Sequence, residues 1–406
     1  MHHLPVALLE ADSCKGALVL AFGADFHVAD SVRKGNVIAS TVDYAACDSG
    51  VAKIEKARDG SAIKAAAFSR DGSLLAVCTL DKSVYIYDTA EWACLRSTTT
   101  EKRTNAICFD PAGDHLATGD KFGDSYRISV HGSQADDAAE QNKHEILLGH
   151  VSIICDVKFS FSGRSPASQQ YVLTCDRDEK IRISKYPNAY NIQAFCLGHT
   201  EFVTSISTAP FAPENAVTGA GDGTVRLWEI ASGRLLQTVG LEQHLSKYYA
   251  EGRATCGENS HEDRTAATER YGVLRLRACD KLRVFVAIVE RIPAVVILPF
   301  VASGLGTPLV IDLVRAPIDA AVVDDRLVVS LVPASTATQE THVSAEHGAA
   351  QIAVLKPGAG GSFVLDGEYS EALNKIKTLE TAEAPRIESI FVWGNKMYLE
   401  RPRGEA

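Results

Sequence analysis

The sequence has no cysteine spacing that would suit a zinc or thiol-redox site. Its ten cysteines are scattered, and no two of them form a CxxC pair, which disfavours zinc-ribbon and thioredoxin-like chemistry. Several of them, including Cys78, Cys108 and Cys175, lie in apolar runs of the kind that form strands. Because a free cysteine behaves as a small buried hydrophobe, this distribution favours a reducing compartment, the cytosol or the nucleus.

Long apolar segments are also missing. The N-terminal MHHLPVALLEADSC has no basic region and only a short apolar run, unlike a secretory signal. The most apolar region, residues 284–314, is interrupted by Glu290, Arg291 and three prolines. A membrane helix needs roughly 18 or more uninterrupted apolar residues, so we expect short buried strands there and no membrane span.

Positive charge is scarce. The chain has 41 Lys and Arg against 51 Asp and Glu, a formal net charge of -10. Binding to a nucleic-acid backbone needs Lys and Arg to displace counterions from the phosphates. Any nucleic-acid role must therefore use a local basic patch or a basic partner.

Motifs for a cofactor or a metal are weak. The only glycine-rich string, KPGAGGSF at 356–363, has no strand–helix–strand pattern around it, so a hairpin or flexible turn is the better interpretation. HVSAEH at 342–347 offers two histidines and a glutamate, but in a stretch rich in Ser, Thr and Ala. We predict no catalytic residue, no metal site and no cofactor of the chain's own.

What the sequence does contain is a repeat. Phe68, Phe109 and Phe159 each begin an aromatic-x-x-x-Gly turn motif between two apolar runs, and these starts are 41 and 50 residues apart. A period of roughly 40–45 residues with four short strands per unit is typical of β-propellers. With four readable units before Gly240, a first unit near 17–40 and two more in 272–356, the sequence predicts an all-β, seven-bladed propeller.

We expect a single domain over residues 1–400, with the best-defined blades at 62–240 and a short tail at 401–406. An early strand at 4–9 is expected to pair with the last blade and close the ring, which would remove an open edge. Four stretches that are rich in turn-forming or polar residues are expected to be insert loops: 131–145, 241–270, 335–349 and 357–386. Within the last of them, residues 370–381 have apolar residues at helical spacing.

The unit at 198–230 resembles a WD repeat most closely. His199, Thr218, Asp222 and Trp228 stand where that family has its structural tetrad, a chain of hydrogen bonds from carboxylate to imidazole to hydroxyl to indole. Such a network holds only if every buried member is satisfied. We interpret these residues as framework and not as catalytic groups.

Two other units keep only part of this pattern. The preceding unit has His150, Thr174 and Asp178 at the corresponding positions, with Ser184 in place of the tryptophan. The unit around Asp81 has Tyr87 at the tryptophan position. We expect these blades to depend more on packing.

Four longer strings extend the resemblance to one family. GDKFGDSY (119–126), LLGH (147–150), TCDRDEKIR (174–182) and FCLGHTEFV (195–203) are similar to the accessory subunit of the tRNA guanine-N7 methyltransferase, and the resemblance covers about residues 105–235. It implies a non-catalytic scaffold that forms a heterodimer with the catalytic subunit. That partner would bind S-adenosylmethionine and supply most contacts to tRNA. The resemblance also implies a nuclear location, with the cytoplasm as a second one.

In that family the DRDEK turn and its neighbours form the docking surface. The resemblance carries this role onto eight residues: Asp176, Arg177, Asp178, Glu179, Lys180, Arg182, Glu201 and Phe202. We expect Lys180→Glu combined with Arg182→Glu to weaken the complex while the propeller stays folded.

Other interpretations remain open. On pattern alone, a solvated charged turn explains residues 175–182 as well as an interface does. Because one fold hosts many functions, a generic WD-repeat adaptor, such as a ubiquitin-ligase substrate receptor or a chromatin platform, is the alternative function. An enzyme with its site in the propeller channel is the least favoured, since no converging acid–base residues can be recognised.

Overall fold

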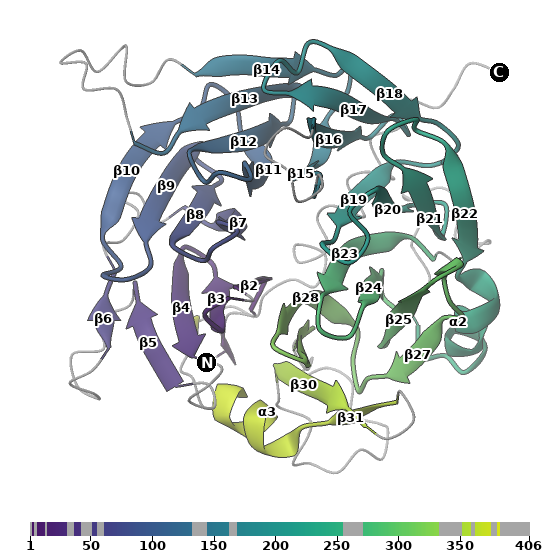
Figure 1. Ribbon diagram of the computed structural model, residues 1–406. Helices are drawn as coiled ribbons and strands as arrows, with labels where there is room; N and C mark the ends of the chain where they lie inside the picture. The colour runs from purple at the N-terminus through teal and green to yellow at the C-terminus, as the bar shows by residue number, and fades with distance from the viewer. Residues whose placement is uncertain are drawn as a thin grey trace, which may run out of the picture.

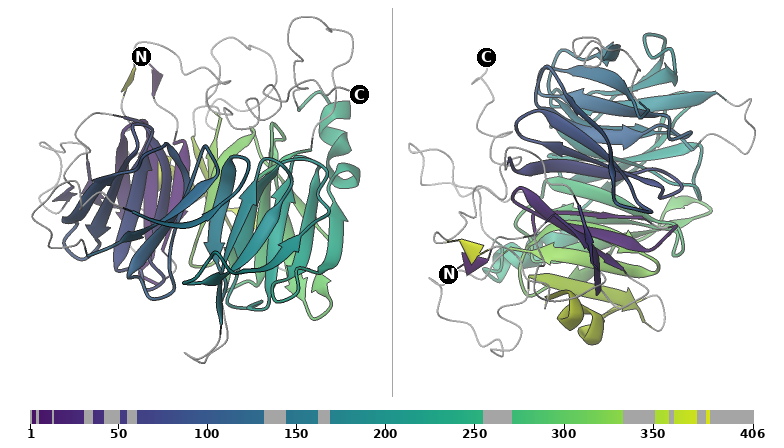
Figure 2. Two further views of the ribbon diagram at one scale, coloured as in Figure 1. Left: turned by 90° about the horizontal axis from the view of Figure 1, so that it is seen from above. Right: turned by 90° about the vertical axis from the view of Figure 1, so that its left-hand side faces the viewer.

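The computed structural model describes residues 2–3, 6–12, 14–30, 36–41, 51–54, 61–131, 144–161, 169–254, 271–332, 351–358, 362–374 and 380–381. Seven sheets stand around a central axis, so the predicted seven-bladed β-propeller is confirmed (Figure 1). The blades form a ring one blade thick, with a small two-stranded pair standing beyond one face (Figure 2). No helix in the described ranges is long and apolar enough to cross a membrane.

Blades 2 to 5 are four-stranded antiparallel sheets whose strands run in chain order from the axis to the rim. Blade 2 has β7 (Ile63–Phe68), β8 (Leu74–Thr79), β9 (Ser83–Asp88) and β10 (Cys94–Thr99). Blade 3 has β11 (Thr104–Phe109), β12 (His115–Asp120), β13 (Asp124–Ser129) and β14 (Glu145–Gly149). Blade 4 has β15 (Ile154–Phe159), β16 (Gln170–Asp176), β17 (Ile181–Tyr186) and β18 (Ile192–Cys196). Blade 5 has β19 (Val203–Thr208), β20 (Asn215–Ala220), β21 (Thr224–Glu229) and β22 (Leu235–Gly240).

The remaining blades vary this plan. Blade 1 has β2 (Leu8–Ala11), β3 (Ala17–Phe22), β4 (Asp25–Asp30) and β5 (Asn36–Ser40), with β6 (Ala52–Lys53) added in parallel. Blade 6 has β23 (Val273–Cys279), β24 (Val284–Val289), β25 (Ala294–Val301), β26 (Gly304–Leu305) and β27 (Leu309–Asp312). Blade 7 has β28 (Pro317–Val323), β29 (Arg326–Leu331), β30 (Ile352–Pro357) and β31 (Phe363–Leu365).

Two of the expected insert loops contain regular structure. In the 241–270 stretch, helix α2 (Glu242–Ala250) buries Leu245 and Tyr248, three residues apart on one helical face, against blade 6. In the 357–386 stretch lie β31 and helix α3 (Gly367–Asn374). The expectation of a loop is therefore wrong for α2 and β31, because short apolar patterns suffice when a blade offers an apolar surface, whereas α3 overlaps the predicted helical spacing at 370–381. Residues 132–143 and 335–349 lie outside the described residues.

Closure of the ring also differs from the prediction. The early strand β2 pairs with β3 of its own blade and not with the last blade. Strand β1 (His2–His3) pairs instead with β32 (Glu380–Thr381). Side chains of blades 1 and 7 fill the seam between the two ends of the chain, and Leu9, Leu18 and Val328 are fully buried there. Packing of side chains across this boundary therefore contributes to closure of the ring, for which the sequence predicts a strand paired with the last blade.

Candidate docking face

One face of the ring carries the loop that enters each innermost strand and the turn after each second strand; we call it the tetrad face. In blade 5, the Trp228 indole N–H donates to Thr218 Oγ1 over 2.7 Å, and Thr218 Oγ1 lies 2.8 Å from His199 Nε2. His199 Nδ1 lies 2.8 Å from Asp222 Oδ2. The assignment that satisfies all four groups has the hydroxyl donating to Nε2 and Nδ1–H donating to the carboxylate. This series of hydrogen bonds ties the entering loop to the turn and engages all four tetrad side chains.

The carboxyl group of Asp222 stays ionised inside this network. Burial alone would raise its pKa, but hydrogen bonds from His199, Thr224 and the Thr200 backbone N–H hold the pKa at about 2. Hydrogen bonding to the charged form outweighs desolvation here. The low pKa is therefore a property of a framework residue.

Blade 4 corrects one assignment from the sequence. His150 Nδ1 lies 2.8 Å from Asp176 Oδ2, and His150 Nε2 lies 2.7 Å from Thr174 Oγ1. The aspartate of this network is therefore Asp176 and not Asp178. Strand β16 runs on through Asp176, which places its side chain toward the imidazole, while Asp178 accepts a hydrogen bond from Ser152 Oγ at 3.0 Å.

Blades 2 and 4 complete their tetrad regions differently. Tyr87, at the tryptophan position of blade 2, is 1% exposed and packs in the apolar cluster between blades 1 and 2. At the same position blade 4 has Ser184, whose hydroxyl accepts from Arg182 Nε at 2.8 Å. Arg182 also donates to the carbonyl oxygens of Gly149 at 3.1 Å and Ala189 at 2.8 Å. Its guanidinium thus joins three segments of blades 3 and 4.

Three of the eight predicted docking residues are buried. Asp176 is 1% exposed, Phe202 2% and Arg182 9%. Phe202 belongs to the core between blades 4 and 5, and a Cβ on Gly221 would lie 2.7 Å from its ring. A partner cannot reach these side chains, so their assignment to a docking surface is corrected: they build the turn and do not present it.

The other five lie at the surface or close to it. Lys180 and Asp178 are exposed, whereas Arg177, Glu179 and Glu201 are half-buried. Arg177 is held at the turn by its backbone N–H, which donates to Ile153 O at 3.0 Å. The structure therefore brings a charged turn to the tetrad face at the place that the sequence indicated.

Two exposed apolar side chains on the same face were not identified as candidate docking residues from the sequence. Phe122, in the turn between β12 and β13, is 56% exposed, and Val151, in the loop entering β15, is 95% exposed. The segments that carry them touch: the His150 N–H donates to Gly123 O at 2.7 Å, and a Cβ on Gly123 would lie 2.4 Å from His150 O. A phenylalanine between a lysine and a glycine in a tight turn was the available signal.

Two lysines lie beside the Phe122 ring. The Lys102 and Lys121 ammonium groups lie 5.1 and 5.0 Å from the centre of the Phe122 ring, a geometry that is favourable for cation–π attraction. The neighbouring turn of blade 4 adds Lys180. We call this set the blade 3–4 surface: Lys102, Lys121, Phe122, Val151, Arg177 and Lys180.

The described residues offer little for chemistry. They contain no group of three or more His, Cys, Asp or Glu placed to hold a metal ion, and the HVSAEH segment lies outside them. In the glycine-rich string, the Gly358 N–H after β30 donates to Ser362 O before β31 at 2.8 Å, and residues 359–361 lie outside the described residues. The geometry of the tetrad face fits the binding of another protein surface better than a reaction.

A ring of seven blades with a complete tetrad in blade 5 defines a WD-repeat propeller. The family model described as "tRNA methyltransferase TRM82 WD40 domain" matches residues 34–143 and 132–355. The chain therefore belongs to the TRM82 WD40 family.

Individual relatives agree with this membership. A protein of Mus musculus named tRNA (guanine-N(7)-)-methyltransferase non-catalytic subunit WDR4 is 34% identical over 235 residues, which cover 56% of this chain and 54% of the relative. The Homo sapiens protein of the same name is 39% identical over 178 residues, 43% of this chain and 39% of the relative. An Aspergillus oryzae protein, the non-catalytic subunit trm82, is 32% identical over 192 residues, 36% of this chain and 39% of the relative. The chain thus spans about half, or less, of the length of the curated relatives it matches.

Solved structures support the fold alone. The WD40 repeats of RRP9 superpose with a TM-score of 0.60 at 16% identity, covering 88% of this chain and 95% of that one. A chain of the mitotic checkpoint complex gives a TM-score of 0.59 at 17% identity, with 80% and 83% covered.

Proposed function

We propose that this chain is the non-catalytic subunit of a tRNA guanine-N7 methyltransferase, and that it binds and stabilises the catalytic subunit in a heterodimer. Membership of the TRM82 WD40 family and the names of the relatives support the subunit role. The observation that carries the binding role is the blade 3–4 surface, where Phe122 and Val151 are exposed and two lysines lie beside the Phe122 ring.

This surface has the composition of a protein interface. Aromatic side chains in the centre of a contact supply most of the binding energy, while charges at the rim give specificity and speed association. Phe122 and Val151 are the central apolar groups, and Lys180 and Lys121 are exposed at their border. A partner surface with an apolar centre and acidic rim fits this chemistry.

The proposed mechanism needs no catalytic residue on the propeller. A protein that binds only the active form of its partner shifts the partner toward that form by the difference in affinity. S-adenosylmethionine would bind to the catalytic subunit. Because the chain has a net charge of -10, we assign most phosphate contacts to the catalytic subunit as well; tight binding of tRNA by the isolated chain at physiological salt would contradict this.

The test compares two lysines at opposite ends of one strand. Lys180 precedes β17 on the tetrad face, and Lys185 is exposed near the opposite end of the same strand. We expect Lys180→Glu to weaken binding of the catalytic subunit about 10-fold, Phe122→Ala about 30-fold, and Lys185→Glu not at all. Calorimetric titration of the purified subunits measures all three.

Each outcome separates one claim from another. Wild-type affinity for both Lys180→Glu and Phe122→Ala would overturn the assignment of the surface. Failure of the unaltered chain to bind the catalytic subunit would overturn the subunit role, and affinity purification that returns ubiquitin-ligase components instead would favour an adaptor. The proposal also places the complex in the nucleus, and a purely cytoplasmic tagged chain would contradict that part.

A further inference from the structure

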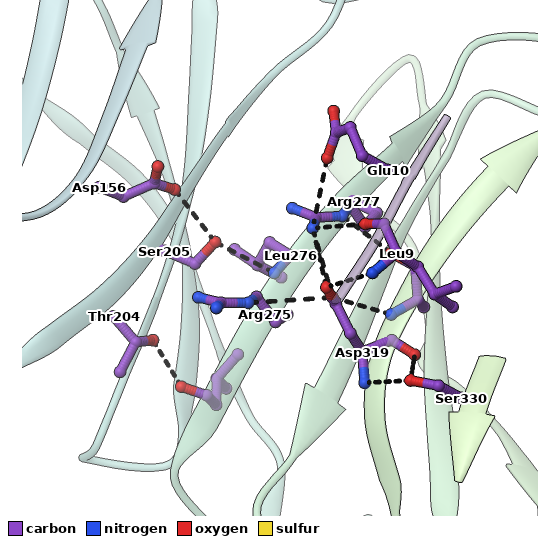
Figure 3. Close-up of polar contacts among 12 residues, drawn as sticks. Leu9, Glu10, Asp156, Thr204, Ser205, Arg275, Leu276, Arg277, Asp319 and Ser330 are labelled. Atoms are coloured by element: carbon purple, nitrogen blue, oxygen red, sulfur yellow. Dashed lines mark hydrogen bonds and ion pairs between the residues drawn. The ribbon is translucent and has the colours of Figure 1, made fainter. Parts of the chain in front are cut away.

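The innermost strands of the ring pose a hydrogen-bonding problem. Each is the edge strand of its blade, so alternate backbone N–H groups face away from the blade's own sheet. Buried N–H groups of this kind must find another acceptor or cost free energy. Three blades, 5, 6 and 1, solve this at the axis of the propeller, and Figure 3 draws the contacts to blades 6 and 1.

Two aspartates, each at the third position of its strand, accept hydrogen bonds from backbone N–H groups of two blades. Asp156 is the third residue of β15, and Asp319 is the third residue of β28. One carboxylate oxygen accepts the next N–H of the same strand, from Val157 at 2.9 Å or Ala320 at 2.9 Å. The other oxygen accepts an N–H of the following blade.

The second contact reaches across the gap between blades. Asp156 Oδ2 accepts from the Ile206 N–H of blade 5 at 2.9 Å, and Asp319 Oδ2 accepts from the Leu9 N–H of blade 1 at 3.1 Å. Ser205, the third residue of β19, repeats the pattern: its hydroxyl oxygen accepts from the Leu276 N–H of blade 6 at 3.1 Å.

Cations balance the charge of the buried Asp319. Its side chain is 2% exposed, and Arg277 Nη2 lies 3.3 Å from Oδ1 while Arg275 Nε lies 3.8 Å away. Arg277 Nε also donates to Ala320 O at 2.8 Å, and its Nη2 lies 3.7 Å from Glu10 Oε2 of blade 1. Blades 6, 7 and 1 therefore meet at this carboxylate (Figure 3).

We infer that three side chains near the axis, those of Asp156, Ser205 and Asp319, each fix the following blade through a hydrogen bond to its innermost strand. Asp319 is then the residue that closes the ring. The boundary between blades 7 and 1 differs from the others because no chain connection spans it. Asp156 lies at the boundary between blades 4 and 5, which residues 197–202 also bridge. Asp319 lies at the boundary between blades 7 and 1, which among the described residues is held only by side chains and by the β1–β32 pair.

Hydrogen–deuterium exchange of the full chain, read by mass spectrometry, tests this. In Asp319→Ala we expect exchange to rise roughly 10-fold in β2 and β28, with blades 2 to 5 unchanged. In Asp156→Ala we expect a smaller rise, in β19 of the following blade. The matched control is Asp324→Ala, which also removes an aspartate of blade 7 paired with blade 6, here the partly exposed contact to Lys281 at 2.9 Å; it should leave β2 unchanged.

The test depends on which strands exchange faster. A uniform rise in exchange in all blades, or an unchanged exchange rate in β2 of Asp319→Ala, would overturn the inference. If Asp319→Ala does not fold, Asp319→Asn replaces it, because the amide oxygen can keep one of the two N–H contacts. The rise in β2 should then exceed that in every blade from 2 to 5, and equal rises would count against a closing role.

Discussion

Arg182 offers the sharpest test of how the docking turn is built. The residue is 9% exposed, and its guanidinium donates to Ser184 Oγ, Gly149 O and Ala189 O over 2.8, 3.1 and 2.8 Å. Burial lowers the pKa of this guanidinium, which remains charged at neutral pH. Replacement by alanine removes three charge-assisted hydrogen bonds, two of them to backbone carbonyl oxygens.

The expected loss in the free energy of unfolding is large compared with the total stability of a domain. A hydrogen bond to a charged group contributes about 1.5–3 kcal/mol, but contacts of one side chain are not additive. We expect Arg182→Ala to lower the free energy of unfolding by about 3–5 kcal/mol, and Arg182→Glu by more, because a carboxylate would face two carbonyl oxygens. Arg182→Lys should fall between these variants and the native chain, since one ammonium cannot reach three separated acceptors.

Urea unfolding followed by circular dichroism measures these differences. Arg234→Ala is the matched control, because Arg234 also lies close to a polar partner, Glu229, but its side chain is 66% exposed. An Arg182→Ala midpoint that equals the Arg234→Ala midpoint would refute the reasoning. The expectation that Lys180→Glu with Arg182→Glu leaves the propeller folded is also replaced: only the Lys180 change should be neutral for folding.

Three further predictions concern the tetrad face. Trp228→Phe removes the indole N–H from Thr218 but keeps most of the ring volume, and should lower the free energy of unfolding by about 1–2 kcal/mol in urea titrations. Asp222, whose pKa is held at about 2 against an ordinary value of 3.8, contributes about 2.5 kcal/mol above pH 4 that is lost as the pH falls toward 2; the difference in stability between the native chain and Asp222→Asn should shrink over that interval and stay constant above it. Gly123→Ala forces a side chain onto a backbone with φ of 103° and against His150 O, so its melting temperature should fall well below that of Gly240→Ala, where a Cβ meets nothing within 4 Å.

The repeat made the fold predictable, but not every contact within it. The tetrad of blade 5 could be assigned from His199, Thr218, Asp222 and Trp228 because four residue types at fixed offsets have one geometric solution. Blade 4 has two aspartates, two residues apart, and the sequence could not show which of them faces His150. The answer depends on how far β16 extends, and that is a property of the folded sheet.

Burial was the main source of error at the candidate site. A charged turn next to Phe202 resembles an aromatic surrounded by a polar rim, yet Phe202 fills the core beneath Gly221. The resemblance assigns Arg182 to the docking surface together with the DRDEK turn, but its three acceptors come from segments that only the fold brings together. Phe122 was missed for the opposite reason, since a large apolar residue in a turn is more often buried than exposed.

The most direct test of the proposed role is a methylation assay with purified components. We expect the catalytic subunit and the native chain together to form N7-methylguanosine in tRNA, the chain alone to form none, and Lys180→Glu to require about 10-fold more chain for half-maximal activity. Equal rates for the catalytic subunit with and without the chain, or methylation by the chain alone, would contradict the proposal that the propeller holds the enzyme and performs none of the chemistry.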